Sequence, residues 1–215
     1  MDIVTGVGVL DKAVHVLRAV AERPLGLNNL QAATGLPRAT AHRLAVALES
    51  HGLLRRDEDG RFDLGPELAA LGRAASARFP LASLALPALE SLRDDSGESV
   101  QLFVREGTQR RCVLSLQSPH ALRWIVPEGV LFPLVLGSAG RVLMGETSGP
   151  GWVQSVEERE PGVASVSAPV TGPDRSVIAA VGISGPIERL SRQPGKQYGD
   201  RVVTAAARIS VAITH

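Results

Sequence analysis

The chain has 215 residues, 44% of them hydrophobic, and a formal net charge of +1 at pH 7. The length allows one large or two small domains, and the hydrophobic content excludes wholesale disorder. Because the chain is nearly neutral, any binding to nucleic acid has to depend on a local basic patch. The single cysteine, Cys112, excludes an internal disulfide and a cysteine-based zinc cluster, and its apolar neighbours suggest a buried side chain.

The first 50 residues predict three helices. Residues 9–21 carry apolar side chains at helical spacing. A second, short helix is expected to bury Leu30 and Ala33 and to end at Gly35, which can adopt a left-handed turn. Pro37 fits the first turn of the third helix, where its missing N–H costs nothing.

The third predicted helix, residues 37–50, has two different faces. Its apolar face follows the helical repeat and is expected to lie in the core, with Ala41, Leu44, Ala45 and Leu48. The arginines of the opposite face can reach phosphates or guanine edges, and its alanine lets the helix approach the bases closely. The residues expected to contact DNA on this face are Arg38, Ala39, Thr40, His42 and Arg43.

Two short strands are predicted next, over residues 53–56 and 61–64. An Asp-Gly turn ending at Gly60 joins them, as is typical of a hairpin. Arg61 is the expected DNA contact of this hairpin, whereas the other two arginines are expected to be solvated or paired with the acidic turn. Helix, turn, helix and hairpin is the order of a winged helix-turn-helix, which places a recognition helix in the DNA major groove.

A connector helix is predicted over residues 66–77, and Phe79-Pro80 marks the expected domain boundary. A further helix over residues 81–95 is expected to bury Leu84, Leu89 and Leu92.

After residue 97 the pattern changes to strands. Two helices are predicted among them, over residues 136–144 and 198–213. The second half is therefore of the α+β class with a mainly antiparallel sheet. The predicted strands cover residues 98–105, 111–117, 122–126, 162–170 and 176–183.

Both halves resemble the IclR family of bacterial transcription regulators. In the first half the resemblance rests on TGLPRATAHRL at residues 34–44 and LESHGLLRRDEDGRFDLG at residues 48–65. In the second half it rests on LGSAGRVLM at residues 136–144, EREPGVASVSAPV at residues 158–170 and VGISGPIERL at residues 181–190. The resemblance covers nearly the whole chain and looks closest to an actinobacterial branch linked to amino-acid metabolism.

The resemblance implies a domain plan and a set of partners. Residues 1–65 would form a winged helix-turn-helix DNA-binding domain, residues 66–78 a linker helix, and residues 79–215 a GAF-like domain for effector binding and oligomerisation. Members of the family bind a pseudo-palindromic, double-stranded operator as a dimer or a dimer of dimers. The implied effector is a carboxylate-bearing or amino-acid-like metabolite, and the implied location is the cytoplasm.

The resemblance also implies an effector pocket. A Gly-Ser-Ala-Gly turn opens the helix at residues 136–144, so its backbone N–H groups can hold an anion. The next part of the lining is expected from the family's penultimate strand, and the last strand is expected to close the far side. The implied effector-binding residues are Gly137, Ser138, Ala139, Ala164, Ser167 and Ser184.

The chain departs from the family pattern between Met144 and Trp152. Only seven residues lie between them, where relatives carry a few dozen that form helices beside the pocket. Either the pocket is trimmed or a segment is missing from this sequence, and the run ETSGPG, which is not typical of a junction between two packed elements, favours a missing segment.

Two other functions are compatible with parts of the pattern. The second half could be a catalytic domain fused to a winged helix, or a small-molecule sensor that acts on a protein partner. The five histidines are scattered, and metal-ligand spacing, a P-loop and a nucleophile elbow are all absent from the sequence. We therefore expect no catalytic residues, metal or cofactor. The longest apolar run falls short of the ~20 residues of a membrane helix, so no membrane association is expected.

Overall fold

The computed structural model describes residues 7–78, 80–146 and 149–214. It divides into two compact units, Met1–Phe79 and Pro80–His215. Among the described residues, no helix combines the length and apolar character needed to cross a membrane.

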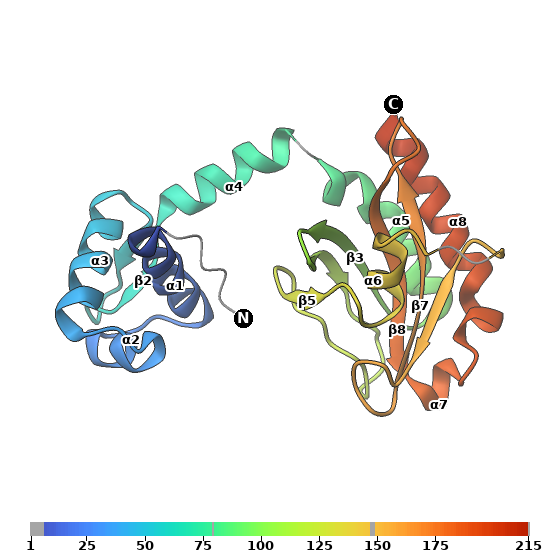
Figure 1. Ribbon diagram of the computed structural model, residues 1–215, viewed down its shortest axis with the longest axis horizontal. Helices are drawn as coiled ribbons and strands as arrows, with labels where there is room; N and C mark the ends of the chain where they lie inside the picture. Colours follow the sequence, from blue (N-terminus) through green and yellow to red (C-terminus); the bar gives the residue numbers. More distant parts are fainter. Residues whose placement is uncertain (1–6, 79, 147–148, 215) are drawn as a thin grey trace. The chain divides into compact units, whose positions relative to one another are not determined.

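The first unit is a three-helix cluster closed by a small hairpin and followed by one further helix (Figure 1). Its core contains the fully buried side chains of Val16, Leu30 and Phe62. The hairpin joins this core because Leu25 and Phe62 exchange backbone hydrogen bonds of 2.9 Å. The elements are α1 (Gly8–Glu22), α2 (Leu27–Thr34), α3 (Arg38–Ser50), β1 (Leu54–Arg56), β2 (Phe62–Leu64) and α4 (Pro66–Arg78).

The α2 helix ends at Gly35 in a left-handed turn, as predicted. Gly35 is left-handed at φ 65°, and its N–H donates to the carbonyl of Gln31. The prediction for Ala33 is wrong, because its side chain is exposed and Thr34 is buried instead. Thr34 lies one full turn after Leu30 and therefore faces the same core, and its hydroxyl donates to the Leu30 carbonyl at 2.7 Å.

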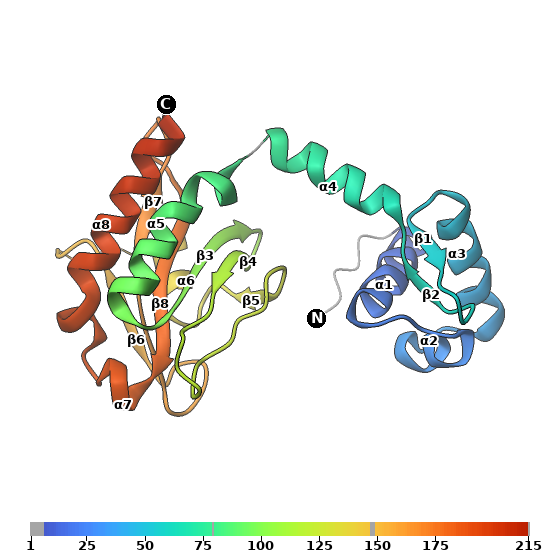
Figure 2. The ribbon, with the colours of Figure 1, turned by 180° about the vertical axis from the view of Figure 1, so that it is seen from behind.

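The second unit is one antiparallel sheet of six strands in the order β5-β4-β3-β8-β7-β6. Helices α5 and α8 cover one face, and the short α6 lies on the other (Figures 1 and 2). The strands are β3 (Ser99–Glu106), β4 (Gln109–Leu116), β5 (Leu131–Pro133), β6 (Val153–Val156), β7 (Val163–Thr171) and β8 (Val177–Pro186), and the helices are α5 (Leu81–Ser96), α6 (Ser138–Leu143), α7 (Ile187–Leu190) and α8 (Pro194–Thr214).

Side-chain alternation divides the sheet between two cores. Val100 and Leu102 of β3 face α5 and α8, together with Val166 of β7. Phe103 faces the α6 side, where it packs with a second, smaller cluster. The central strands are therefore buried on both faces, and the polar side chains on the α6 side are enclosed.

Some elements of the second unit differ from the prediction. Residues 122–126 form no strand, and Val126 instead packs into the α6-side core. The short strands β5 and β6, and the helix α7, were not predicted. Leu84 was expected in the core but is 37% exposed, while Ala85 is buried at the adjacent position of α5.

Trp152, which follows the short junction after α6, packs on α8 over two glycines. Residues 147–148 of the junction lie outside the described residues. A Cβ atom on Gly195 would lie 2.0 Å from the Trp152 ring, and one on Gly199 would lie 2.3 Å from its Nε1 atom. Glycine at both positions is therefore required for the indole to lie on the helix.

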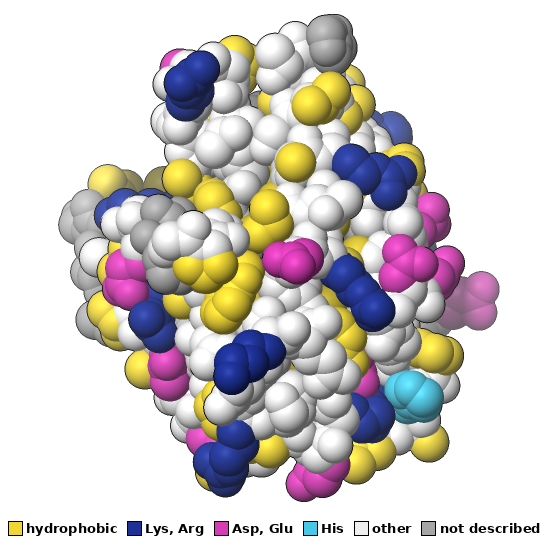
Figure 3. Space-filling view, turned by 90° about the vertical axis from the view of Figure 1, so that its right-hand side faces the viewer, with side chains coloured by type: hydrophobic (Ala, Val, Ile, Leu, Met, Phe, Trp, Pro, Cys, Tyr) yellow, Lys and Arg dark blue, Asp and Glu magenta, His cyan; other side chains and the backbone are white. Residues whose placement is uncertain are grey.

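The α8 side of the molecule carries charged side chains of both signs among apolar ones (Figure 3).

Candidate functional site

One exposed face of α3 carries the residues predicted to contact DNA. Arg38, Ala39, His42 and Arg43 are exposed, and Thr40 lies half-buried at the margin. The opposite face is buried, with Ala41, Ala45 and Leu48 in the core. Arg38 donates to the side-chain oxygen of Asn28 in α2, which ties the start of α3 to the preceding helix. The predicted division of this helix into a core face and a solvent face is therefore present in the structure.

Arg61, the predicted DNA contact of the hairpin, is held by the acidic turn. Its guanidinium lies 2.7 Å from Asp57 and 2.7 Å from Asp59. Its side chain is nevertheless 49% exposed, and exposed ion pairs of this kind are screened by water and contribute little to stability. Exchanging these carboxylates for a DNA phosphate would therefore cost little.

The other two arginines of the hairpin are exposed, which was one of the two predicted alternatives, and each also has a partner within the first unit. Arg55 pairs with Asp63 at 2.6 Å across the strands, and Arg56 stacks 4.1 Å above the ring of Phe62. Arg56 also donates to the Gly60 carbonyl of the turn at 2.8 Å, whereas the carboxylates of Asp57 and Asp59 pair with Arg61. Both arginines therefore remain exposed while they contact the hairpin.

The second unit contains a cavity on the α6 side of the sheet. Its volume is about 40 Å³, and about 10–15 Å³ is enough for one water. Ser138 of α6 projects into the sheet side of this space, where its hydroxyl lies 2.8 Å from those of Ser165 and Ser167. On the adjoining strands, Ser184 donates to the side-chain oxygen of Gln101 at 2.7 Å. Serine and glutamine side chains therefore line the sheet side of the cavity, next to the apolar cluster on the α6 side.

Five of the six predicted effector-binding residues line this cavity: Gly137, Ser138, Ala139, Ser167 and Ser184. Ala164 does not, because it belongs to the core on the α5 and α8 side. Alternate residues of β7 point to opposite faces, so its neighbours Val163 and Ser165 line the cavity instead.

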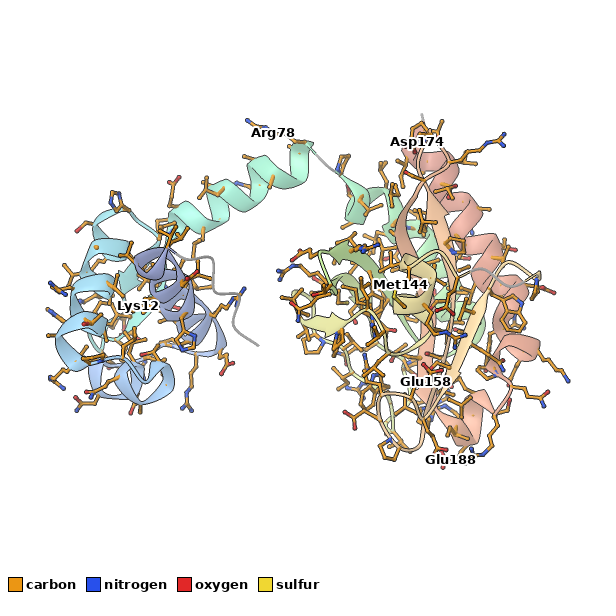
Figure 4. The ribbon with its side chains drawn as sticks, in the orientation of Figure 1. Lys12, Arg78, Met144, Glu158, Asp174 and Glu188 are labelled. Carbon is orange, nitrogen blue, oxygen red and sulfur yellow. The ribbon has the colours of Figure 1, made fainter. Side chains whose placement is uncertain are left out.

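The start of α6 does not offer the free anion site that was predicted. Glu158, from the loop between β6 and β7, accepts a hydrogen bond of 3.0 Å from the Gly137 N–H. The same carboxylate lies 3.2 Å from Arg141. Glu158 and Met144, the residue directly after α6, are labelled in Figure 4. The protein's own carboxylate therefore already interacts with the backbone at the start of this helix.

Sequence reasoning missed the two arginines that line the cavity, Arg110 and Arg159. Arg110 is only 2% exposed and lies between Phe103 and Phe132, with its guanidinium carbon 5.4 Å and 5.5 Å from the ring centroids. Burial lowers the pKa of Arg110 to about 10, and the charge of Arg159 adds to this effect. The Arg-Arg pair at residues 110–111 was a usable signal, because one member of such a pair in a strand must face inward.

Comparison with known proteins identifies the chain. A family profile described as the IclR helix-turn-helix domain matches residues 9–58, and one described as the bacterial transcriptional regulator IclR C-terminal domain matches residues 73–149 and 145–211. The chain belongs to the IclR family. It is therefore a transcription regulator with a helix-turn-helix and a C-terminal effector domain, as the resemblance implied.

Two relatives are glycerol operon regulatory proteins of Streptomyces. The one from Streptomyces griseus is 29% identical, over 95% of this chain and 94% of its own length. The one from Streptomyces coelicolor is 30% identical, over 86% of this chain and 87% of its own length. Among solved structures, an IclR homolog of Microbacterium hydrocarbonoxydans complexed with 4-hydroxybenzoate has a TM-score of 0.80 at 20% identity, over 95% of this chain and 98% of that one.

The comparisons also bear on the short junction after α6. The alignment with the Streptomyces griseus protein spans 241 positions, which is more than the 215 residues of this chain. The C-terminal profile matches in two stretches that meet at residues 145–149. The relative therefore carries residues that this chain lacks, and a segment missing at the junction stays a prediction.

Cys112 lies in β4 on the α6 side, next to the cavity but fully buried. Burial raises the pKa of its thiol to about 12, with a contribution from the negative charge of Glu128. Since the thiolate is the reactive form, we expect Cys112 in the native protein to react with Ellman's reagent at pH 8 on the order of 1000-fold more slowly than in urea. Equal rates in the two conditions would show that the thiol is accessible and ionised.

Proposed function

We propose that residues 1–65 of this regulator bind DNA, that residues 66–78 act as a linker helix, and that residues 79–215 bind an effector and hold the chains together. The operator is a pseudo-palindrome, and the protein binds it as a dimer or a dimer of dimers. It acts in the cytoplasm, where operator DNA lies, and it regulates transcription rather than catalysing a reaction. A role in amino-acid metabolism, expected from the resemblance, stays a prediction.

The exposed face of α3 is the observation that carries the DNA-binding proposal. Arg43 and His42 project from it, and Ala39 leaves room for close approach to the bases. The buried face of the same helix fixes its orientation in the winged fold. Because the whole chain is nearly neutral, one copy of this small basic face would bind weakly, and two copies on two half-sites supply the affinity.

The cavity on the α6 side is the proposed effector site. It lies in the domain that the family uses for effectors, and a structural neighbour of this fold binds 4-hydroxybenzoate. We propose a carboxylate-bearing or amino-acid-like effector, whose binding would shift the balance between two arrangements of the dimer and so change the spacing of the two α3 helices.

Selection from a random pool of duplex DNA tests the function. The full chain should enrich a sequence with two related half-sites, and fluorescence anisotropy should then give its affinity. Replacing Arg43 with alanine should weaken this affinity by about 5- to 150-fold, the cost of one good base contact. If Arg43 contacts a phosphate instead, binding should weaken on all sequences and the salt slope should fall by about one.

Arg105→Ala is the matched control. Arg105 is an exposed arginine of β3 in the other unit, so its removal changes the net charge equally. This variant should bind the selected DNA like the wild type. The proposal fails if no sequence is enriched, or if Arg43→Ala keeps both the affinity and the salt slope of the wild type.

A further inference from the structure

Arg110 is a buried cation without a carboxylate partner among the described residues. One of its terminal nitrogens donates to the carbonyl of Pro133, but its Nε atom is buried and has no hydrogen-bond partner. Phe103 and Phe132 cover its sides. Buried arginines are rare unless they are paired, because a charge removed from water needs an opposite charge or a full set of hydrogen bonds. Arg110 therefore presents a buried, unsatisfied donor beside the cavity.

A second guanidinium extends toward the same cavity. Arg159, in the loop between β6 and β7, lies 4.2 Å above the ring of Phe132 and 5.2 Å above that of Trp124. Burial lowers the pKa of Arg159, and the negative charge of Glu160 partly opposes this. Burial is the main reason why the pKa of Arg110 is lowered, and the charge of Arg159 lowers it further, because two arginines on one aromatic wall repel each other. An anion between them would remove that repulsion.

The carboxylates of the same loop have other partners. Glu158 binds Gly137 and Arg141, and Glu157 pairs with Arg192 at 2.9 Å. Glu160 lines the cavity, but its side chain is exposed at the rim. The anion that would complete the environment of Arg110 therefore has to come from outside the described part of the chain.

The far side of the cavity presents one more unused donor. Gln101 is 2% exposed, and its side-chain oxygen accepts from Ser184, which fixes the orientation of the amide. Its Nε2 atom is buried and has no partner. A ligand with an anionic group for Arg110 and a separate acceptor oxygen for Gln101 would satisfy both buried donors.

We propose that the cavity binds a small organic carboxylate with a second acceptor oxygen. Arg110 binds the carboxylate, Arg159 covers it from the β6–β7 loop, and the amide of Gln101 donates to the second oxygen. A cavity of about 40 Å³ limits the ligand to an acid with a short carbon skeleton. This inference rests on the proposed effector role of the domain, and it assigns the recognition of the anion to Arg110 rather than to the start of α6.

Thermal unfolding of the full chain without DNA tests the proposal. Both tryptophans lie in the second unit, so their fluorescence reports on that unit. Malonate at 10 mM should raise the Tm of the wild type above its value in sodium chloride of equal ionic strength. Malonamide, which has a similar shape without charge, should give no such rise, and acetate, which has no acceptor group besides its one carboxylate, should give a smaller one.

Substitutions identify the residues. Arg110→Met and Gln101→Leu should each abolish the malonate shift, and Arg159→Met should reduce it. Arg105→Met, a matched loss of an exposed arginine, should keep it. Without ligand, Arg110→Met should be at least as stable as the wild type, with a Tm up to about 4 °C higher, because it removes an uncompensated buried charge.

Three results would overturn the proposal: no shift with malonate, an equal shift in Arg110→Met, or a lower Tm of unliganded Arg110→Met, which would make the guanidinium structural. None of these results involves DNA. If malonate gives no Tm shift, the DNA-binding proposal can still be tested by the operator experiment. If the protein does not bind DNA, the malonate shift still tests the ligand proposal.

Discussion

Replacing Arg189 with methionine should destabilise the second unit by about 3–5 kcal/mol, the cost of leaving a buried charge unpaired. The charge concerned is that of Glu98, whose side chain is 2% exposed at the start of β3. Arg189 of α7 donates to both carboxylate oxygens of Glu98, at 2.5 Å and 2.8 Å. The pair joins the segment after β8 to the strand beside it, and the hydrogen bonds that Arg189 donates to Glu98 raise the pKa of Arg189.

Urea unfolding followed by tryptophan fluorescence measures the effect, because Trp124 and Trp152 both belong to this unit. The double variant Glu98→Met/Arg189→Met is the control. It removes both charges and keeps similar side-chain volume, so it should recover most of the lost stability. If the single variant unfolds at the wild-type urea concentration, Glu98 is solvated in solution and the pair contributes nothing.

Local signals in the sequence were sufficient for the DNA-binding unit. Gly35 determines where α2 ends, Pro37 precedes the first turn of α3, and Gly60 is left-handed at φ 73° in the hairpin turn. Each of these residues determines backbone conformation within a few positions, so no knowledge of distant contacts was needed. The predicted faces of α3 followed from its helical period for the same reason.

The second unit depends on contacts that are distant in sequence. The edge strand β5 exists because it pairs with β4, and its three residues carry too short a pattern to be recognised alone. The predicted strand at residues 122–126 has suitable alternation but pairs with no strand in the described structure. Local periodicity cannot distinguish a segment that pairs, such as β5, from one that does not, such as residues 122–126. Whether a segment becomes a strand depends on its hydrogen bonds to strands that are distant in sequence.

The cavity shows the same limit at the level of single residues. Ser167 and Ser184 line the cavity as predicted. Ala164 was also predicted to line it, but its side chain points to the opposite face of β7, and its two neighbours line the cavity instead. A shift of one residue in a strand reverses every side chain. Arg110 was missed because the predicted strand began at Arg111, whereas β4 begins at Gln109. A predicted strand that starts one or two residues late therefore leaves out the arginine that is buried.

Replacing Gly65 with alanine should disrupt the first unit alone. Gly65 lies between β2 and α4, and a Cβ atom on it would lie 2.0 Å from the carbonyl oxygen of Gly52 and 2.8 Å from the backbone carbon of Leu53. Both neighbours are backbone atoms, so neither can move aside without displacing the hairpin. The Gly65 N–H also donates to the Leu53 carbonyl at 2.9 Å, which couples the end of the hairpin to its beginning. We expect a loss of about 3 kcal/mol, at the upper end of the usual overpacking range.

The two units can be separated spectroscopically, because the first contains no tryptophan. Gly65→Ala should therefore lower the temperature of helix loss by circular dichroism and abolish operator binding, while the tryptophan transition of the second unit stays unchanged. Gly72→Ala is the matched control: its Cβ would meet nothing within 4 Å in α4, so this variant should keep the wild-type stability or gain about 0.5–1 kcal/mol. If Gly65→Ala binds the operator normally, the close approach of the hairpin to Gly65 is not needed to hold α3 in its DNA-binding position.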